Sequence, residues 1–303
     1  MEGEELHVNV PGFDGGDRTD IGLPAAQNAV LERAAATGKP LVVVLMSGSA
    51  VALDWAKDHA AAIVAAWYPG ESGGTAIAQV LAGDYSPAGR LPVTFYRSVR
   101  DLPPFTSYQM AGRTYRYFKG EPLYAFGHGL SYTHFGYTEA KASTITLNAG
   151  QPLTASVTVR NEGARAGDEV VQAYLSYPGT DPLAPQRTLV GLQRIPLMPG
   201  KSRRVSFTLD PRALSSVDAA AHRAVQPGNS TLTLGGRQPG DAPTPTPTFQ
   251  IPGEPPLSHR ARARPPHPPA TLHAPQHPAH PVLPRPPRSA PPSCLRHPPS
   301  SPP

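Results

Sequence analysis

The sequence predicts an α/β domain, then an all-β domain, then a tail that cannot build a core. Between Leu23 and about Phe95, helical periodicity alternates with short continuous apolar runs. After Phe135, short stretches of alternating apolar and polar residues are separated by turns, and after Ile251 proline dominates. We place the three segments at residues 1–135, 136–251 and 252–303.

The first part of the α/β domain predicts a helix followed by a buried strand. Ala26, Val30 and Ala34 recur at a helical interval, and Gly38 ends the helix. The run Leu41–Met46 is continuously apolar, as expected for a strand buried on both faces of a parallel sheet.

A second strand and a second helix follow. The apolar run Ala61–Tyr68 ends at Pro69-Gly70, and a helical pattern resumes over Thr75–Ala82. Strand, loop, helix and strand in this order predict an incomplete, mostly parallel sheet covered by helices.

Two glycine-rich loops follow the predicted strands. They are Ser47-Gly48-Ser49 and Tyr68–Gly74. Ligands of open parallel sheets bind beyond the carboxyl ends of the strands, so these loops either face a ligand or are tight connections.

The second domain shows strands of period two. The apolar residues of three strands fall on one face each: Ala155, Val157 and Val159; Val171, Ala173, Leu175 and Tyr177; Val205, Phe207 and Leu209. Turn sequences separate them at Asn161–Gly163, Pro178-Gly179, Pro199-Gly200 and Pro227-Gly228. The pattern predicts an antiparallel sandwich of about 100 residues.

The tail accounts for the basic character of the chain. The sequence has 303 residues, of which 16% are charged, and nearly half of its 40 prolines lie after Ile251. Six arginines against the single acid Glu254 in the tail account for the formal net charge of +5. The folded part is therefore near neutral, which argues against nucleic acid as a partner. The tail is expected to be disordered, either as a solvated linker or as translation in a wrong frame.

Cysteine and histidine usage predicts neither metal nor cofactor. Cys294, the one cysteine, lies in the tail, and the histidines of the folded region, His7, His59, His128, His134 and His222, have no His-x-x-x-His spacing. The sequence also has no apolar run of about 18 residues, which argues against a membrane partner.

The acidic residues at the start of the sequence are the strongest candidates for chemistry. Glu2, Glu4 and Glu5 lie close together, and crowded carboxylates raise one another's pKa, so one of them can act as a general acid. An acidic, solvated terminus is the alternative. This segment precedes any strand or helix that could carry it, and we therefore expect a truncated enzyme.

Two further pairs have alternative interpretations. Asp17-Arg18 is either an ion pair that fixes its loop or a pair that grips a polar ligand. Asp54-Trp55 suggests a sugar platform, but its place in a predicted short helix favours Trp55 as a core residue. The glycines around His128 predict a tight backbone path between the domains.

Other enzyme motifs are missing. Ser47-Gly48-Ser49 is not a Gly-x-Ser-x-Gly nucleophile elbow, and Gly70–Thr75 lacks the lysine of a phosphate-binding loop. Neither a serine hydrolase nor a nucleotide-binding protein is indicated.

An ordered series of motifs resembles glycoside hydrolase family 3, the family of retaining β-glucosidases and β-xylosidases. The motifs, which extend the similarity over residues 2–251, are Glu2-Gly-Glu-Glu5, Pro11-Gly-Phe-Asp-Gly-Gly-Asp-Arg18, Trp67-Tyr-Pro-Gly-Glu-Ser-Gly-Gly-Thr75, Ala88-Gly-Arg-Leu-Pro-Val-Thr-Phe95, Gly112-Arg-Thr-Tyr-Arg-Tyr117 and Tyr124-Ala-Phe-Gly-His-Gly-Leu-Ser-Tyr132.

The resemblance implies an architecture and a catalytic role. Members carry a (β/α)₈ barrel with a nucleophilic aspartate, an α/β sandwich domain with the acid/base glutamate, and often a fibronectin type III-like domain. This chain resembles the second domain, truncated at its start, and the third. By position the acid/base is Glu4, with Glu2 and Glu5 as possible shifts of register, whereas Asp54 lies in the wrong domain to be the nucleophile.

The expected substrate is a β-linked gluco- or xylo-oligosaccharide or an aryl glycoside, and the expected partner is the missing barrel domain. The resemblance also implies a secreted or periplasmic parent enzyme. The alternatives are a non-catalytic module that binds carbohydrate or associates with a barrel, and a fibronectin-like domain that acts alone as a scaffold.

Overall fold

The computed structural model describes residues 13–14, 17–177, 184–217, 222–240 and 248–251. The part before Phe135 contains short strands and helices: β1 Phe13–Asp14, β2 Asp17–Arg18, α1 Ala25–Ala35, β3 Val42–Leu45, α2 Asp54–His59, β4 Ala62–Ala65, α3 Gly73–Ala82, the 3₁₀ helix η1 Val99–Asp101 and α4 Thr114–Tyr117. The later part contains strands: β5 Phe135–Ala142, β6 Leu153–Asn161, β7 Gly167–Ser176, β8 Thr188–Leu197, β9 Ser202–Leu209, β10 Ser216–Val217, β11 Arg223–Ala224, β12 Gly228–Gly235 and β13 Thr248–Ile251.

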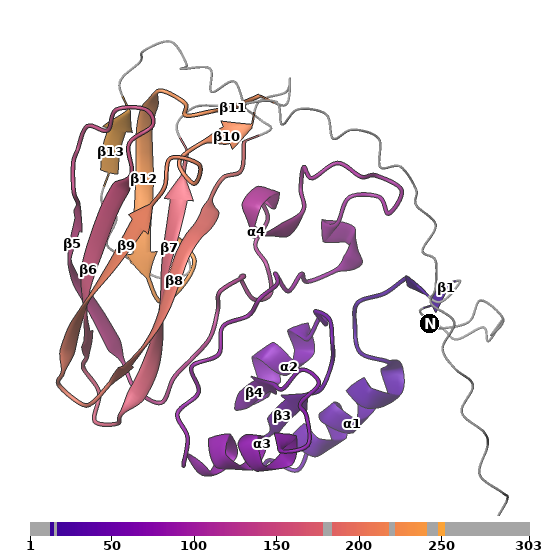
Figure 1. The fold of residues 1–303 in the computed structure, drawn as a ribbon. Coiled ribbons are helices and arrows are strands. Elements are labelled where there is room, and N and C mark those ends of the chain that lie inside the picture. Colours follow the sequence, from indigo (N-terminus) through magenta and orange to yellow (C-terminus); the bar gives the residue numbers. More distant parts are fainter. Residues whose placement is uncertain (1–12, 15–16, 178–183, 218–221, 241–247, 252–303) are drawn as a thin grey trace, which may run out of the picture. The chain divides into compact units, whose positions relative to one another are not determined.

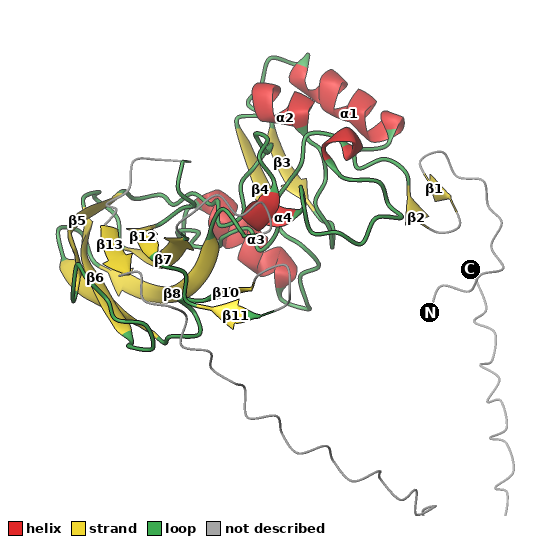
Figure 2. Cartoon of the chain, turned by 90° about the horizontal axis from the view of Figure 1, so that it is seen from above, coloured by secondary structure: helices red, strands yellow, loops and turns green. Residues whose placement is uncertain are grey.

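Strands β3 and β4 form the parallel pair that the two apolar runs predict. Val42 pairs with Ala62 and Leu45 with Ala65, and helices α2 and α3 lie on opposite sides of the pair (Figures 1 and 2). Among the described residues this sheet has only two strands. The prediction that β3 is buried on both faces is wrong for Val42, which is 43% exposed.

Helix α1 confirms the predicted helix but leaves much of its apolar face exposed. It runs from Ala25 to Ala35, and Gly38 follows it with a φ of +71°, a conformation that favours glycine. Val30, part of the predicted stripe, is 66% exposed and lines an apolar groove of about 530 Å³ between α1 and β3.

The later strands form two larger sheets with antiparallel pairing. One sheet has the order β13-β12-β7-β8 and the other β5-β6-β9 (Figure 1). The β7–β8 register shifts between Ala173 and Tyr174, so β8 carries a bulge there.

One cluster of buried side chains joins the two larger sheets. Val157 and Val159 of one sheet and Leu232 and Leu234 of the other are fully buried within it. The predicted inward faces of β6, β7 and β9 belong to this cluster, and Tyr177 is half-buried beside it. The predicted turn at Pro199-Gly200 joins β8 to β9, and Gly200 has a φ of +71°.

Among the described residues, no helix is long and apolar enough to cross a membrane.

A buried ion pair connects the segment after α3 to the β-rich part. Arg90 binds both carboxylate oxygens of Glu169 on β7, at 3.1 and 3.0 Å, and its Nε donates to the Gly236 carbonyl oxygen at 3.0 Å. The Tyr137 hydroxyl donates to the same carboxylate at 2.8 Å. The side chains of Arg90 and Glu169 are only 10% and 3% exposed, so the pair is protected from water.

The opposite face of β7 is covered by residues of the Phe126–Tyr132 segment. The Gln172 amide donates to the Gly127 carbonyl oxygen at 3.1 Å, and the fully buried Tyr174 donates to the Gln172 side chain at 2.6 Å. A side chain at Gly127 would place its Cβ 2.3 Å from Gln172, so glycine is required by close approach as well as by its φ of +79°. The tight path predicted from the glycines around His128 is confirmed.

Loss of Arg90 should strongly destabilise the fold. We expect Arg90→Met to lower the free energy of unfolding by about 3–5 kcal/mol, because it leaves Glu169 buried without its cation. Urea denaturation followed by circular dichroism measures this. Arg97→Met, which removes an exposed ion pair, is the control and should have a much smaller effect. Equal losses in both variants would contradict a special role for the buried pair.

The stability of the protein should depend on pH through Glu169. Burial raises the pKa of this carboxyl group above its usual value of 4.5, and Arg90 and Tyr137 offset only part of that increase. The folded state therefore binds the proton more tightly than the unfolded state. The resulting stabilisation is complete below the unfolded pKa and is lost as the pH rises through the folded pKa.

Comparison with Glu169→Gln isolates this contribution. The free energy of unfolding of the wild type, minus that of the variant, should fall as the pH rises above about 4.5. Urea titrations at a series of pH values test it. A difference that grows with pH would mean that Arg90 outweighs burial.

Candidate functional site

Three segments meet at the carboxyl edge of the β3–β4 pair. Because the strands are parallel, the loops after Leu45 and Ala65 leave from the same edge. A Cβ at Gly48 would lie 2.6 Å from Cε2 of Tyr68, so glycine allows the first loop to approach the Tyr68 ring. This ring is 77% exposed. Gly48 thus allows the close approach of the two loops, and whether they face a ligand stays a prediction.

Arg18 of β2 connects the third segment to the same edge. Its guanidinium donates to the Ser49 hydroxyl at 2.9 Å, to the Asp20 carbonyl oxygen at 3.2 Å and to the Gly22 carbonyl oxygen at 3.5 Å. The side chain is exposed and retains N–H donors that these bonds do not use.

The backbone after Arg18 is held against the loop that follows β3. The Ala52 amide donates to the Ile21 carbonyl oxygen at 2.7 Å, and Gly22 and Ala52 form a parallel bridge. The Asp20 carboxylate accepts from the Gly22 amide and closes a local turn. The chain therefore enters this edge in a fixed position.

This edge presents polar groups beside an exposed aromatic ring. Arg18 and Ser49 offer hydrogen-bonding groups beside the exposed Tyr68 ring, a combination of polar groups and apolar surface typical of small-molecule sites. Within the described ranges, no group of three or more His, Cys, Asp or Glu side chains could hold a metal ion.

The predicted acid/base residues lie outside the described residues. This applies to Glu2, Glu4 and Glu5, whose roles stay predictions. The Asp17 side chain is also outside the description, so its ion pair with Arg18 stays a prediction. The backbones of Asp14 and Asp17 are paired in the antiparallel β1–β2 ladder.

Asp54 and Trp55 have structural partners. Asp54 accepts from Arg97 at 2.9 Å, and this hydrogen bond raises the pKa of the Arg97 guanidinium. Arg97 also contacts Glu121 at 3.4 Å. Trp55 stacks on His59 with the ring centroids 4.4 Å apart and packs against the core of this part, as the sequence predicts.

Sequence reasoning missed the roles of Arg90 and Glu169. Arg90 lies in a motif that we quoted, but its partner could not be named. The period-two alternation offers a clue for Glu169, because it shares its face of β7 with Val171 and Ala173. A carboxylate at an inward position requires a cation or hydrogen-bond donors.

The comparisons with known proteins agree with the motif series. Residues 2–132 match the family described as "Glycosyl hydrolase family 3 C-terminal domain", and residues 169–238 match "Fibronectin type III-like domain". A xylan 1,4-beta-xylosidase of Xylanibacter ruminicola is 42% identical over 78% of this chain and 27% of the relative. A periplasmic beta-glucosidase of Salmonella typhimurium is 40% identical over 72% of this chain and 30% of the relative.

Solved structures give the same result. A β-glucosidase from Erythrobacter marinus is 37% identical, with a TM-score of 0.68, over 78% of this chain and 31% of that chain. Beta-glucosidase 3B from Thermotoga neapolitana is 27% identical, with a TM-score of 0.71, over 80% of this chain and 37% of that chain. The chain thus spans about a third of the length of the proteins it matches. Residues 2–132 of the chain are therefore a glycosyl hydrolase family 3 C-terminal domain, and a fibronectin type III-like domain follows over residues 169–238.

Proposed function

We propose that this chain supplies the general acid/base of a retaining β-glycosidase and that Glu4 is this residue. The relatives named β-xylosidase and β-glucosidase, at 42% and 40% identity, carry the proposal. The substrate class is a β-linked gluco- or xylo-oligosaccharide or an aryl glycoside. We also propose residues 1–135, 136–251 and 252–303 as an α/β sandwich domain, a fibronectin type III-like sandwich and a tail.

The fixed entry of the chain at Arg18 supports a working position for the acidic segment. Arg18 and the Ile21–Ala52 hydrogen bond hold residues 18–22 against the loop that follows β3. Arg18 lies 14 residues after Glu4, so the anchor keeps Glu4 within the length of the intervening chain from this edge. A general acid needs this restriction, because it must lie within hydrogen-bond distance of the glycosidic oxygen.

The chemistry needs a second carboxylate. In a retaining mechanism the two carboxyl groups lie about 5–5.5 Å apart; one attacks the anomeric carbon and the other protonates the leaving oxygen, then deprotonates water. We assign the second role to Glu4 and expect the nucleophile from a barrel domain, as the family resemblance implies. The 303-residue chain alone should therefore release no nitrophenol from an aryl β-glucoside or β-xyloside.

A chimera tests the assignment of Glu4. We would replace the matching C-terminal portion of the Salmonella β-glucosidase with residues 1–251 and measure kcat/KM. Glu4→Gln should lower turnover of cellobiose by about 10²–10⁴-fold, because its leaving group needs protonation. A dinitrophenyl glucoside, whose leaving group needs little protonation, should lose much less. Azide should restore part of the turnover of this glucoside by the Glu4→Gln chimera, because azide attacks the glycosyl-enzyme without the deprotonation that water needs.

Glu2→Gln and Glu5→Gln are matched controls. They change the charge equally and should leave the ratio of the two substrates' kcat/KM near that of the unaltered chimera. A large selective loss for cellobiose in one of these variants, with Glu4→Gln unaffected, would move the acid/base to that residue. Steady nitrophenol release by the purified chain, abolished by Glu4→Ala, would contradict the need for a barrel domain.

A further inference from the structure

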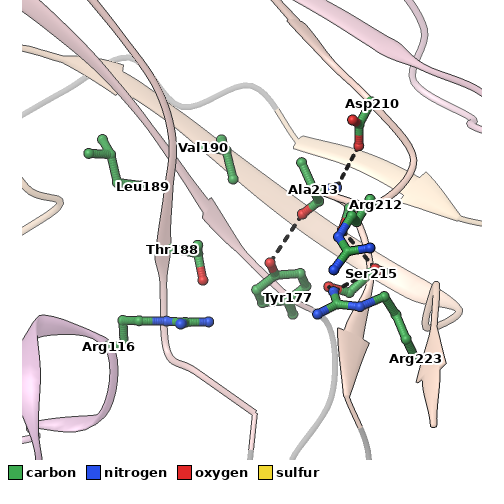
Figure 3. Close-up of a pocket in the computed structure, with 10 residues that line it drawn as sticks. All are labelled: Arg116, Tyr177, Thr188, Leu189, Val190, Asp210, Arg212, Ala213, Ser215 and Arg223. Carbon is green, nitrogen blue, oxygen red and sulfur yellow. Dashed lines mark hydrogen bonds between the residues drawn. The ribbon is translucent and has the colours of Figure 1, made fainter. Parts of the chain in front are cut away.

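A second cavity lies between α4, the start of β8 and the segment after β9. Its volume is about 380 Å³, near the lower end of the range of about 300–1,000 Å³ for small-molecule sites. Figure 3 shows Arg116 on one side of the Tyr177 ring and Arg212 and Arg223 on the other. Thr188 also contributes to the wall. The sequence motifs and the proposed glycosidase function leave this cavity without a role.

Positive charge predominates in this cavity. Three of the residues that line it are arginines, and Asp210 is the one acid among them. The Asp210 carboxylate accepts a hydrogen bond from the Ala213 amide at 3.0 Å, and within the described part of the chain it forms no ion pair with any of the three arginines. Among the described residues, Asp210 is thus the one acid at the cavity, and it forms an ion pair with none of the three arginines.

Two buried polar atoms in the wall also lack partners. Arg116 Nε and Thr188 Oγ1 are inaccessible to solvent and make no hydrogen bond to any described residue. Buried polar atoms are almost always hydrogen-bonded, but both of these atoms are closed to solvent, so a ligand in the cavity reaches them only if the wall shifts. An oxygen acceptor satisfies the Arg116 donor, and the threonine hydroxyl can donate or accept.

The cavity wall is held in place before any ligand binds. The Arg116 carbonyl oxygen accepts from the Gln186 amide at 2.8 Å, and the Tyr177 hydroxyl donates to the Ala213 carbonyl oxygen at 3.1 Å. Arg223 donates to the Ser215 hydroxyl at 3.0 Å (Figure 3). Because these wall residues are already fixed, less conformational entropy is lost when a ligand binds. Arg212 is exposed, and its guanidinium makes no hydrogen bond with a described residue, so it is free to bind a ligand.

We propose that this cavity binds a small molecule through a carboxylate or phosphate group. Arginine guanidinium groups form paired, charge-assisted hydrogen bonds with both kinds of oxyanion. Arg212 and Arg223 bind the oxyanion, and Arg116 adds the third positive charge of the cavity wall. The cavity volume limits the ligand to about the size of a single sugar or a small organic acid.

Calorimetric titration of the full chain tests the proposal. The probes are D-glucuronate, glucose 6-phosphate, inorganic phosphate and uncharged glucose, each at low and at high salt. We expect one or more of the anions to bind at least tenfold more tightly than glucose, and to bind more weakly at high salt. Tighter binding of glucuronate identifies a carboxylate ligand, and tighter binding of either phosphate identifies a phosphate ligand.

Arg212→Ala is the informative variant, with Arg203→Ala as its control. Both residues are exposed arginines of the β-rich part, but Arg203 does not line the cavity. Arg212→Ala should weaken anion binding about tenfold or more, as expected for loss of one charge-assisted hydrogen bond, while Arg203→Ala should leave it unchanged. Thermal unfolding of both variants checks that they fold. Absence of anion binding, binding of glucose equal to that of the anions, or equal losses in the two variants would overturn the proposal.

Discussion

The buried pair of Arg90 and Glu169 is the interaction on which the relation between the α/β part and the β-rich part depends. Two ions removed from water are tolerated only where each has close, well-directed partners. Both oxygens of Glu169 are engaged by Arg90, and Tyr137 and the Gly236 carbonyl oxygen complete the set. A hydrophobic contact tolerates small displacements, whereas this network fixes one position of Arg90 against β7.

Local regularities in the sequence identified the strands β3, β4, β6, β7 and β9 and the helices α1, α2 and α3, whereas β5, β8, β12, β13 and α4 were not predicted individually. The β-rich part was predictable because its two larger sheets are antiparallel and their inward residues follow a period of two, as in Val157 and Val159. The helix before Gly38 and the parallel strands also followed from short-range patterns. The exposure of Val30 and Val42 did not, because burial of an apolar residue depends on which element covers it. No periodicity encodes that information.

The candidate site was predictable in kind and only partly in its contacts. The rule that ligands bind beyond the carboxyl ends of parallel strands led to the loops around Gly48 and Tyr68. The hydrogen bond from Arg18 to Ser49 joins residues from different loops, and a sequence gives no distance between them. The role of Glu4 was assigned from the order of the family motifs. Because Glu4 itself lies outside the described residues, enzyme kinetics is the test of that role.

Strand β7 is covered on both faces, and this limits how freely the β-rich part can be exchanged during evolution. Val171 and Leu175 face the core, while Gln172 and Tyr174 on the other face meet Gly127 and its neighbours. A fibronectin-like domain transferred alone to another enzyme would expose a buried tyrosine, an amide and an unpaired carboxylate. Recombination that moves such domains between genes is therefore expected to carry the α/β part along with it.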